Sequence, residues 1–135
     1  MTGRGRVLVV DDEPEVLDTL REILEELGYK ASVAASGEQA IAAMATVQPH
    51  VVFLDMMMPG VSGLEALTYF RQHYRRVPVI VITGSVEQKV AREARAGGAF
   101  DVVGKPFDMD ALQGLLARAM QLAARSDLRA GSDQH

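Results

Sequence analysis

Residues 7–14 read VLVVDDEP, and this stretch decides the fold. Four consecutive apolar residues fit a short strand that is covered on both faces, and the proline behind the acids suits the first position of a helix. Three later apolar runs, 51–54, 79–82 and 102–103, also lead into a residue that can handle phosphate or metal. Because open α/β folds bind ligands at the carboxyl edge of their parallel strands, the sequence predicts a site built from Asp11, Asp12, Asp55, Thr83 and Lys105.

Helical periodicity fills the intervals between the runs. The first helix is expected over 14–27 with Gly28 as its stop, and a weak strand follows over 29–34. Capping-box patterns predict three further helix starts, and an aspartate predicts the start of the last helix; these signals are Ser36 with Gln39, Ser62 with Glu65, Ser85 with Gln88, and Asp108. The second helix should end near 47 and the fourth at 97–98, with a short strand over 100–103 behind it. The third helix should turn Leu64, Leu67 and Phe70 inward, and the last helix should bury Leu112, Leu115, Leu116, Ala119, Met120 and Ala123.

Strands that alternate with helices imply a parallel sheet with helices on both faces. We therefore expect an α/β, flavodoxin-like, doubly wound five-stranded parallel sheet in the order 2-1-3-4-5, with five helices. In that order Asp11 and Asp12 face Asp55, and we expect Thr83 and Lys105 on the far side of the site.

Length and composition limit the class of protein. The chain of 135 residues fits one domain over 6–124, with a tail at 1–5 and a polar end at 125–135 that is either flexible or a truncated linker. A net charge of −4 without a long basic run argues against nucleic-acid binding. No apolar stretch approaches the roughly 18 residues of a membrane span, and the absence of cysteine fits a reducing cytoplasm.

Each candidate residue also has a plain structural interpretation. The acidic pair could favour a helix N-terminus, the threonine could be an ordinary strand residue, and the lysine could be a solvated surface charge. Together, however, Asp11, Asp12 and Asp55 would repel one another unless a hard cation such as Mg²⁺ or Mn²⁺ joins them. The sequence therefore predicts a cation site that also handles phosphate.

Four segments together carry a resemblance to a known family: VLVVDDEP at 7–14, DMMMPGVSG at 55–63, ITG at 82–84 and GAFDVVGKPF at 98–107. The chain resembles the receiver domain of bacterial two-component response regulators. The resemblance implies that Asp55 is the phosphoacceptor, and that Thr83 and Lys105 contact the phosphoryl group. It also implies a Mg²⁺ site and a cis peptide before Pro106; the implied metal ligands are Asp12, Asp55, the backbone carbonyl of Met57, and Asp11 through water.

The same resemblance implies partners. A histidine kinase or a histidine phosphotransfer protein would supply the phosphoryl group, and an effector domain or a downstream protein would receive the signal. The switching surface, and a homodimer contact, would involve the fourth helix, the fifth strand and the fifth helix. Such a domain is no enzyme in the usual sense, since it catalyses only its own phosphorylation and dephosphorylation. Val102 departs from the family, which usually has Tyr or Phe at that position.

Two other functions stay open at this point. A hydrolase of the haloacid-dehalogenase type also combines Asp, Mg²⁺, Thr and Lys, although its nucleophile follows the first strand in an Asp-x-Asp pattern. Here that strand is followed by DDEP. The second alternative is an interaction module that never takes up phosphate.

Overall fold

The structure is a computed structural model that describes residues 5–58, 60, 62–84, 88–105 and 107–133, of which 126–133 are described by their backbone alone. Its centre is a parallel sheet with the order β2-β1-β3-β4-β5. The strands are β1 (Arg6–Val10), β2 (Lys30–Ala34), β3 (Val51–Asp55), β4 (Val79–Thr83) and β5 (Asp101–Gly104). This arrangement confirms the flavodoxin-like order predicted from the apolar runs.

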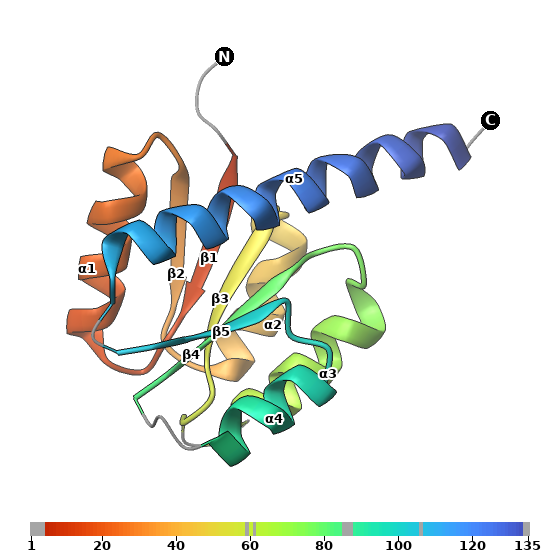
Figure 1. Ribbon diagram of the computed structural model, residues 1–135. Coiled ribbons are helices and arrows are strands. Elements are labelled where there is room, and N and C mark those ends of the chain that lie inside the picture. The colour runs from red at the N-terminus through yellow and green to blue at the C-terminus, as the bar shows by residue number, and fades with distance from the viewer. Residues whose placement is uncertain (1–4, 59, 61, 85–87, 106, 134–135) are drawn as a thin grey trace.

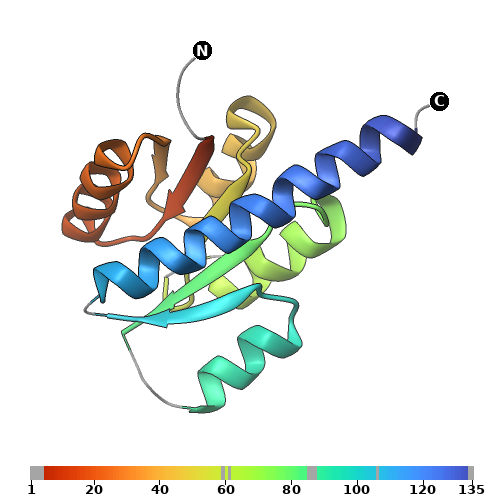
Figure 2. The ribbon, with the colours of Figure 1, turned by 45° about the horizontal axis from the view of Figure 1, so that its top comes forward.

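Helices cover both faces of this sheet, as Figures 1 and 2 show. They are α1 (Pro14–Glu26), α2 (Gly37–Val47), α3 (Gly63–His73), α4 (Gln88–Ala96) and α5 (Met109–Asp133). Alternate side chains of each strand point to opposite faces, so the chain has two cores. Leu8 and Val10 of β1 belong to the core under α2, α3 and α4, whereas Val7 and Val9 belong to the core under α1 and α5.

Local signals start α2, α3 and α5, and end α1, where the sequence predicts. The Ser36 hydroxyl accepts a hydrogen bond from the backbone N–H of Gln39, and the Ser62 hydroxyl accepts one from that of Glu65. The Asp108 carboxylate accepts from two backbone N–H groups at the start of α5. Gly28, just after α1, has φ 94°, a left-handed conformation that glycine adopts without strain.

Two expectations about the helices meet a different outcome, and two further predictions are not tested. Leu64 was expected to face inward in α3 but is exposed, and Ala66, Leu67 and Phe70 are the side chains that α3 buries. The end of the chain was expected to be a flexible tail or a truncated linker from 125, but α5 continues as a helix to Asp133. Ser85 and Pro106, and with them the predicted cap of α4 and the predicted cis peptide, lie outside the described residues.

Among the described residues, no helix is both long and apolar enough to cross a bilayer.

The register of the strands positions the candidate site. Val10 pairs with Leu54, Asp55 pairs with Ile82, and Thr83 pairs with Gly104. The residues at or just after the ends of β1, β3, β4 and β5 therefore lie along one edge of the sheet. This is the edge at which open α/β folds bind ligands.

Candidate functional site

Asp11 begins the loop between β1 and α1 and is completely buried. Its backbone N–H donates to the carbonyl of Ala34 over 3.1 Å, which extends the pairing of β1 with β2 by one residue. Its carboxylate Oδ1 accepts from the backbone N–H of Glu13 at 2.9 Å and so closes a tight turn. Asp12, at the corner of that turn, is exposed. The acidic pair thus consists of one buried and one solvent-facing carboxylate.

Asp55 is the last residue of β3 and is 2% exposed. Its Oδ1 accepts a hydrogen bond of 3.0 Å from the backbone N–H of Met57. Burial raises the pKa of the Asp55 carboxyl to about 6, with a further contribution from the charge of Asp11, while the Met57 N–H and Lys105 act in the opposite direction. Ionisation of the Asp55 carboxyl group is therefore unfavourable in its buried surroundings, and a nearby positive charge makes it easier.

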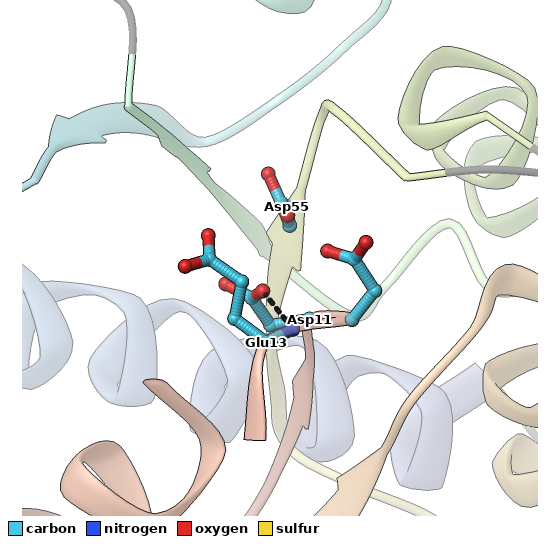
Figure 3. Close-up of side chains that lie close together, drawn as sticks. Asp11, Glu13 and Asp55 are labelled. Carbon is cyan, nitrogen blue, oxygen red and sulfur yellow. Dashed lines mark hydrogen bonds between the residues drawn. The ribbon is translucent and has the colours of Figure 1, made fainter. Parts of the chain in front are cut away.

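The acidic side chains from two loops converge at this edge. Carboxylate oxygens of Asp11, Asp12, Glu13 and Asp55, one from each, lie within 4.8 Å of one another. Figure 3 shows the side chains of Asp11, Glu13 and Asp55 around a common space. The Oδ2 atom of Asp11 is buried, and its partner is the Lys105 ammonium at 3.0 Å, in a contact that lacks hydrogen-bond geometry.

This donor set fits a divalent cation. Mg²⁺ takes oxygen ligands, favours one or two carboxylates together with water and phosphate oxygens, and offsets the repulsion of crowded carboxylates. The buried Asp11 Oδ2 already pairs with one positive charge, the Lys105 ammonium, which shows that this edge of the sheet attracts cations.

Lys105 follows β5 and enters the same site. Its Nζ lies 3.0 Å from Asp11 Oδ2 and 3.0 Å from Glu13 Oε1. Burial lowers the pKa of this ammonium group, but the two carboxylates outweigh burial, so the net direction is upward. The backbone of Lys105 lies beyond β3 and β4, on the far side that the strand order predicts. Its long side chain nevertheless reaches back across the sheet edge to Asp11, which the sequence did not predict.

Thr83 and Met57 lie at or just beyond the same edge of the sheet, whereas Val102 lies within β5, two residues before its end. Thr83 is buried at the end of β4, and its carbonyl accepts from the backbone N–H of Lys105 at 3.0 Å. Met57 is 67% exposed. Val102, where the family usually has an aromatic residue, is half-buried and packs against the core under α2, α3 and α4.

Sequence reasoning missed Glu13. Glu13 is the N-cap of α1, but its side chain makes no capping hydrogen bond. Its carboxylate instead contacts Lys105, which is 92 residues away in sequence. The only signal in the chain was its place as the third acid of the DDE run.

The family of this chain is established by comparison with known proteins. Residues 7–117 match the response regulator receiver domain. The chain belongs to this family and is a receiver domain of two-component signal transduction. This confirms the resemblance that its four sequence motifs indicated.

Particular relatives agree with that assignment. The chain is similar to the regulatory protein AtoC of Escherichia coli K12, with 41% identity over 122 residues, 90% of this chain and 26% of the relative. It is 36% identical to the nitrogen assimilation regulatory protein NtrX of Azorhizobium caulinodans over 91% of this chain and 28% of the relative. The chain thus spans about a quarter of the length of these relatives.

Solved structures show the same fold. NtrX from Brucella abortus, crystallised with ATP, superposes with a TM-score of 0.87 and 31% identity over 98% of this chain and 30% of that chain. The receiver domain of the Francisella response regulator 1452 superposes with a TM-score of 0.78 and 29% identity, over 90% of this chain and 98% of that one.

Proposed function

We propose that Asp55 accepts a phosphoryl group from a phosphorylated histidine of a histidine kinase or a histidine phosphotransfer protein. One Asp55 oxygen forms a bond to phosphorus while the phosphorus–nitrogen bond of the donor breaks. The electron pair of the broken bond stays on the imidazole nitrogen, which takes up a proton from solvent. The observation that carries the proposal is the buried Asp55 carboxylate, which ends β3 within 4.8 Å of the acids after β1.

The residues around Asp55 have complementary roles in this proposal. Asp12, Asp55 and the backbone carbonyl of Met57 would hold Mg²⁺ or Mn²⁺ directly, and Asp11 would hold it through water. When bound, the cation neutralises the charge that gathers on the phosphoryl oxygens during transfer. The Met57 N–H orients the Asp55 carboxylate through its hydrogen bond.

Two further residues would serve the phosphorylated form. Lys105 carries a point charge that can pair with a phosphoryl oxygen, and Thr83 carries a hydroxyl that can donate to another. Phosphorylation would then favour one of two conformations of the surface formed by α4, β5 and α5. The half-buried Val102 lies in β5 within this surface, so we propose a switch that does not depend on an aromatic side chain at that position.

The partners follow from the family and stay part of the proposal. An effector domain or a downstream protein would read the surface of α4, β5 and α5, and a second copy of the chain could pair through it. Direct nucleic-acid binding by this segment is not proposed, given its net charge of −4. Phosphotransfer from a kinase would take place in the cytoplasm. Turnover would be confined to the protein's own phosphoryl group.

A small phosphodonor tests the proposal. Acetyl phosphate with Mg²⁺ should add the mass of one phosphoryl group to the intact protein, and Asp55→Asn should abolish the gain. The same gain in Asp55→Asn would place the phosphoryl group elsewhere. Continuous release of phosphate from a small phosphate ester would instead favour the hydrolase alternative.

A further inference from the structure

Glu13 is the one member of the acidic cluster that the proposed function leaves without a role. It shares the ammonium of Lys105 with Asp11, at 3.0 Å from each carboxylate. Among the described residues, no ion pair joins Lys105 to Asp55. In the unphosphorylated protein, Lys105 is thus directed to the loop after β1 and not to the phosphoacceptor.

The two carboxylates hold Lys105 in different ways. The Asp11 side chain is fully buried, whereas the Glu13 side chain is 62% exposed. A buried anchor keeps the ammonium in the site, but an exposed partner is only weakly attractive and can turn into water. An ammonium has three N–H donors, and Glu13 engages one of them in addition to the one that faces Asp11.

Glu13 also affects the charge of the site. Its carboxylate adds a negative charge within 4.8 Å of Asp55, where a phosphodonor brings further negative charge. Like charges at this distance repel. The Lys105 ammonium offsets less of this repulsion while it is paired with Glu13. Both effects oppose the arrival of a phosphoryl group.

We propose that Glu13 is a positioning residue that restrains Lys105 and slows phosphorylation of Asp55. This inference rests on the proposed function. With acetyl phosphate, an Asp55 oxygen bonds to phosphorus, the phosphorus–oxygen bond to the acetyl group breaks, and acetate leaves with the electron pair. Glu13 turns away as the phosphoryl group arrives, and the N–H that it releases pairs with a phosphoryl oxygen while Asp11 retains Lys105.

The test compares Glu13→Gln with wild type and with Glu15→Gln. Glu15 is a matched control because it is an exposed acid in the first turn of α1, two residues away, and no ion pair with Lys105 is described for it. The first measurement is the rate of mass gain with acetyl phosphate at saturating Mg²⁺. Glu13→Gln should react about two- to fivefold faster, the range that a partly exposed ion pair allows, and Glu15→Gln should match wild type.

The second measurement needs no phosphorylation. In the presence of a chelator, acetic anhydride should modify Lys105 faster in Glu13→Gln than in wild type. The reason is that the amine of Lys105 has then lost its ion pair with Glu13 and is more accessible to the reagent. The chain contains only two other lysines, Lys30 and Lys89, and both are exposed. Their modification rates serve as internal standards in each sample.

The outcomes separate this inference from the function on which it rests. If wild type takes up phosphate as fast as Glu13→Gln, or faster, then Glu13 does not slow phosphorylation and the inference is overturned. Asp55 would still be the phosphoacceptor. Severe loss of Mg²⁺ binding in Glu13→Gln, measured by calorimetry, would make Glu13 a metal ligand and also overturn it. Wild type that takes up no phosphate would sink the proposed function, and the modification rate of Lys105 would still decide whether Glu13 restrains it.

Discussion

In the proposed site, a proton and a divalent cation would compete for the carboxylate of Asp55. Burial raises its pKa to about 6, above the ordinary 3.8. The folded protein therefore binds the proton more tightly than the unfolded chain does, and this contribution to stability is complete at low pH and lost as pH rises from about 4 to about 6.

The pH dependence of unfolding tests this pKa. In a chelator, the urea midpoint of wild type should fall relative to that of Asp55→Asn as pH rises through this window, because the amide does not titrate. Mg²⁺ should restore stability above pH 6, where the carboxylate is ionised. A constant difference between the two midpoints from pH 4 to pH 7 would contradict the raised pKa.

The two acids after β1 should contribute unequally to metal binding. Asp12→Ala should weaken Mg²⁺ binding by at least about tenfold, since even partners that only orient a ligand are worth that much. Asp11→Ala should cost less, because its proposed contact runs through water. Titration calorimetry measures both, and equal affinities of Asp12→Ala and wild type would show that the site is built differently.

Lys105 has a structural role that sequence reasoning did not assign. The sequence places it in the phosphorylated state alone, which predicts little loss of stability on its removal. The structure pairs it with a carboxylate that is completely buried, so Lys105→Met should destabilise the metal-free protein by about 1–3 kcal/mol, the cost of an unsatisfied buried group.

Urea unfolding in a chelator measures that cost, and Arg118→Met, at an exposed position on α5, controls for the loss of a positive charge. Added Mg²⁺ should recover part of the loss in Lys105→Met. An unchanged midpoint in the chelator would show that Lys105 does not stabilise Asp11.

At the scale of elements, the start of α3 determines how the loop after β3 is held. A Cβ atom at Gly63 would lie 2.3 Å from the Cα of Met56 and 2.5 Å from the carbonyl oxygen of Asp55. Backbone atoms cannot yield as a flexible side chain can. The helix therefore packs against the loop after β3 only because residue 63 is glycine.

Gly63→Ala should lower the unfolding midpoint and slow phosphorylation of Asp55, although alanine is the better helix former. Gly114→Ala is the matched control, because a Cβ there meets nothing within 4 Å; it should be neutral or stabilising by up to about 1 kcal/mol. Thermal unfolding and the rate of mass gain with acetyl phosphate compare the two. Similar behaviour of both variants would remove the packing argument.

Sequence reasoning about elements succeeded where the pattern was redundant. Six apolar positions and two end signals defined α1, and the hydroxyls of Ser36 and Ser62 cap as predicted. The prediction that Leu64 faces inward was wrong, because side chains three residues apart are offset by about 60° around a helix. Leu64 therefore points roughly 120° away from Phe70. Ala66 and Leu67 lie closer than Leu64 to the direction of Phe70, and both are buried with it.

At the scale of the whole molecule, the topology followed from a few rules. Fully apolar runs, right-handed crossovers and alternation with helices leave few alternatives to the order found. The same rules gathered Asp11, Asp12 and Asp55, because strand ends determine where their backbones lie. They could not predict the contacts of Lys105 and Glu13, since long side chains choose partners by local charge and space.

The end of α5 shows a second limit. The polar composition over 125–135 predicted a flexible tail or a truncated linker, yet the helix continues to Asp133 and projects past the sheet in Figure 1. Polarity tells that a segment faces solvent, not that it lacks structure. Alanine, leucine and arginine are good helix formers, and several of these residues occur between 122 and 130.

The central claim is that Asp55 carries the phosphoryl group, and peptide mapping after chemical trapping tests it most directly. Borohydride reduces an aspartyl phosphate to homoserine, which marks the modified residue permanently. Trypsin releases residues 31–71 as one peptide in which Asp55 is the only aspartate, whereas Asp11 and Asp12 fall in the peptide 7–21. We predict homoserine at position 55 of protein treated with acetyl phosphate and Mg²⁺, and homoserine in the peptide 7–21 with an unchanged Asp55 would contradict the account.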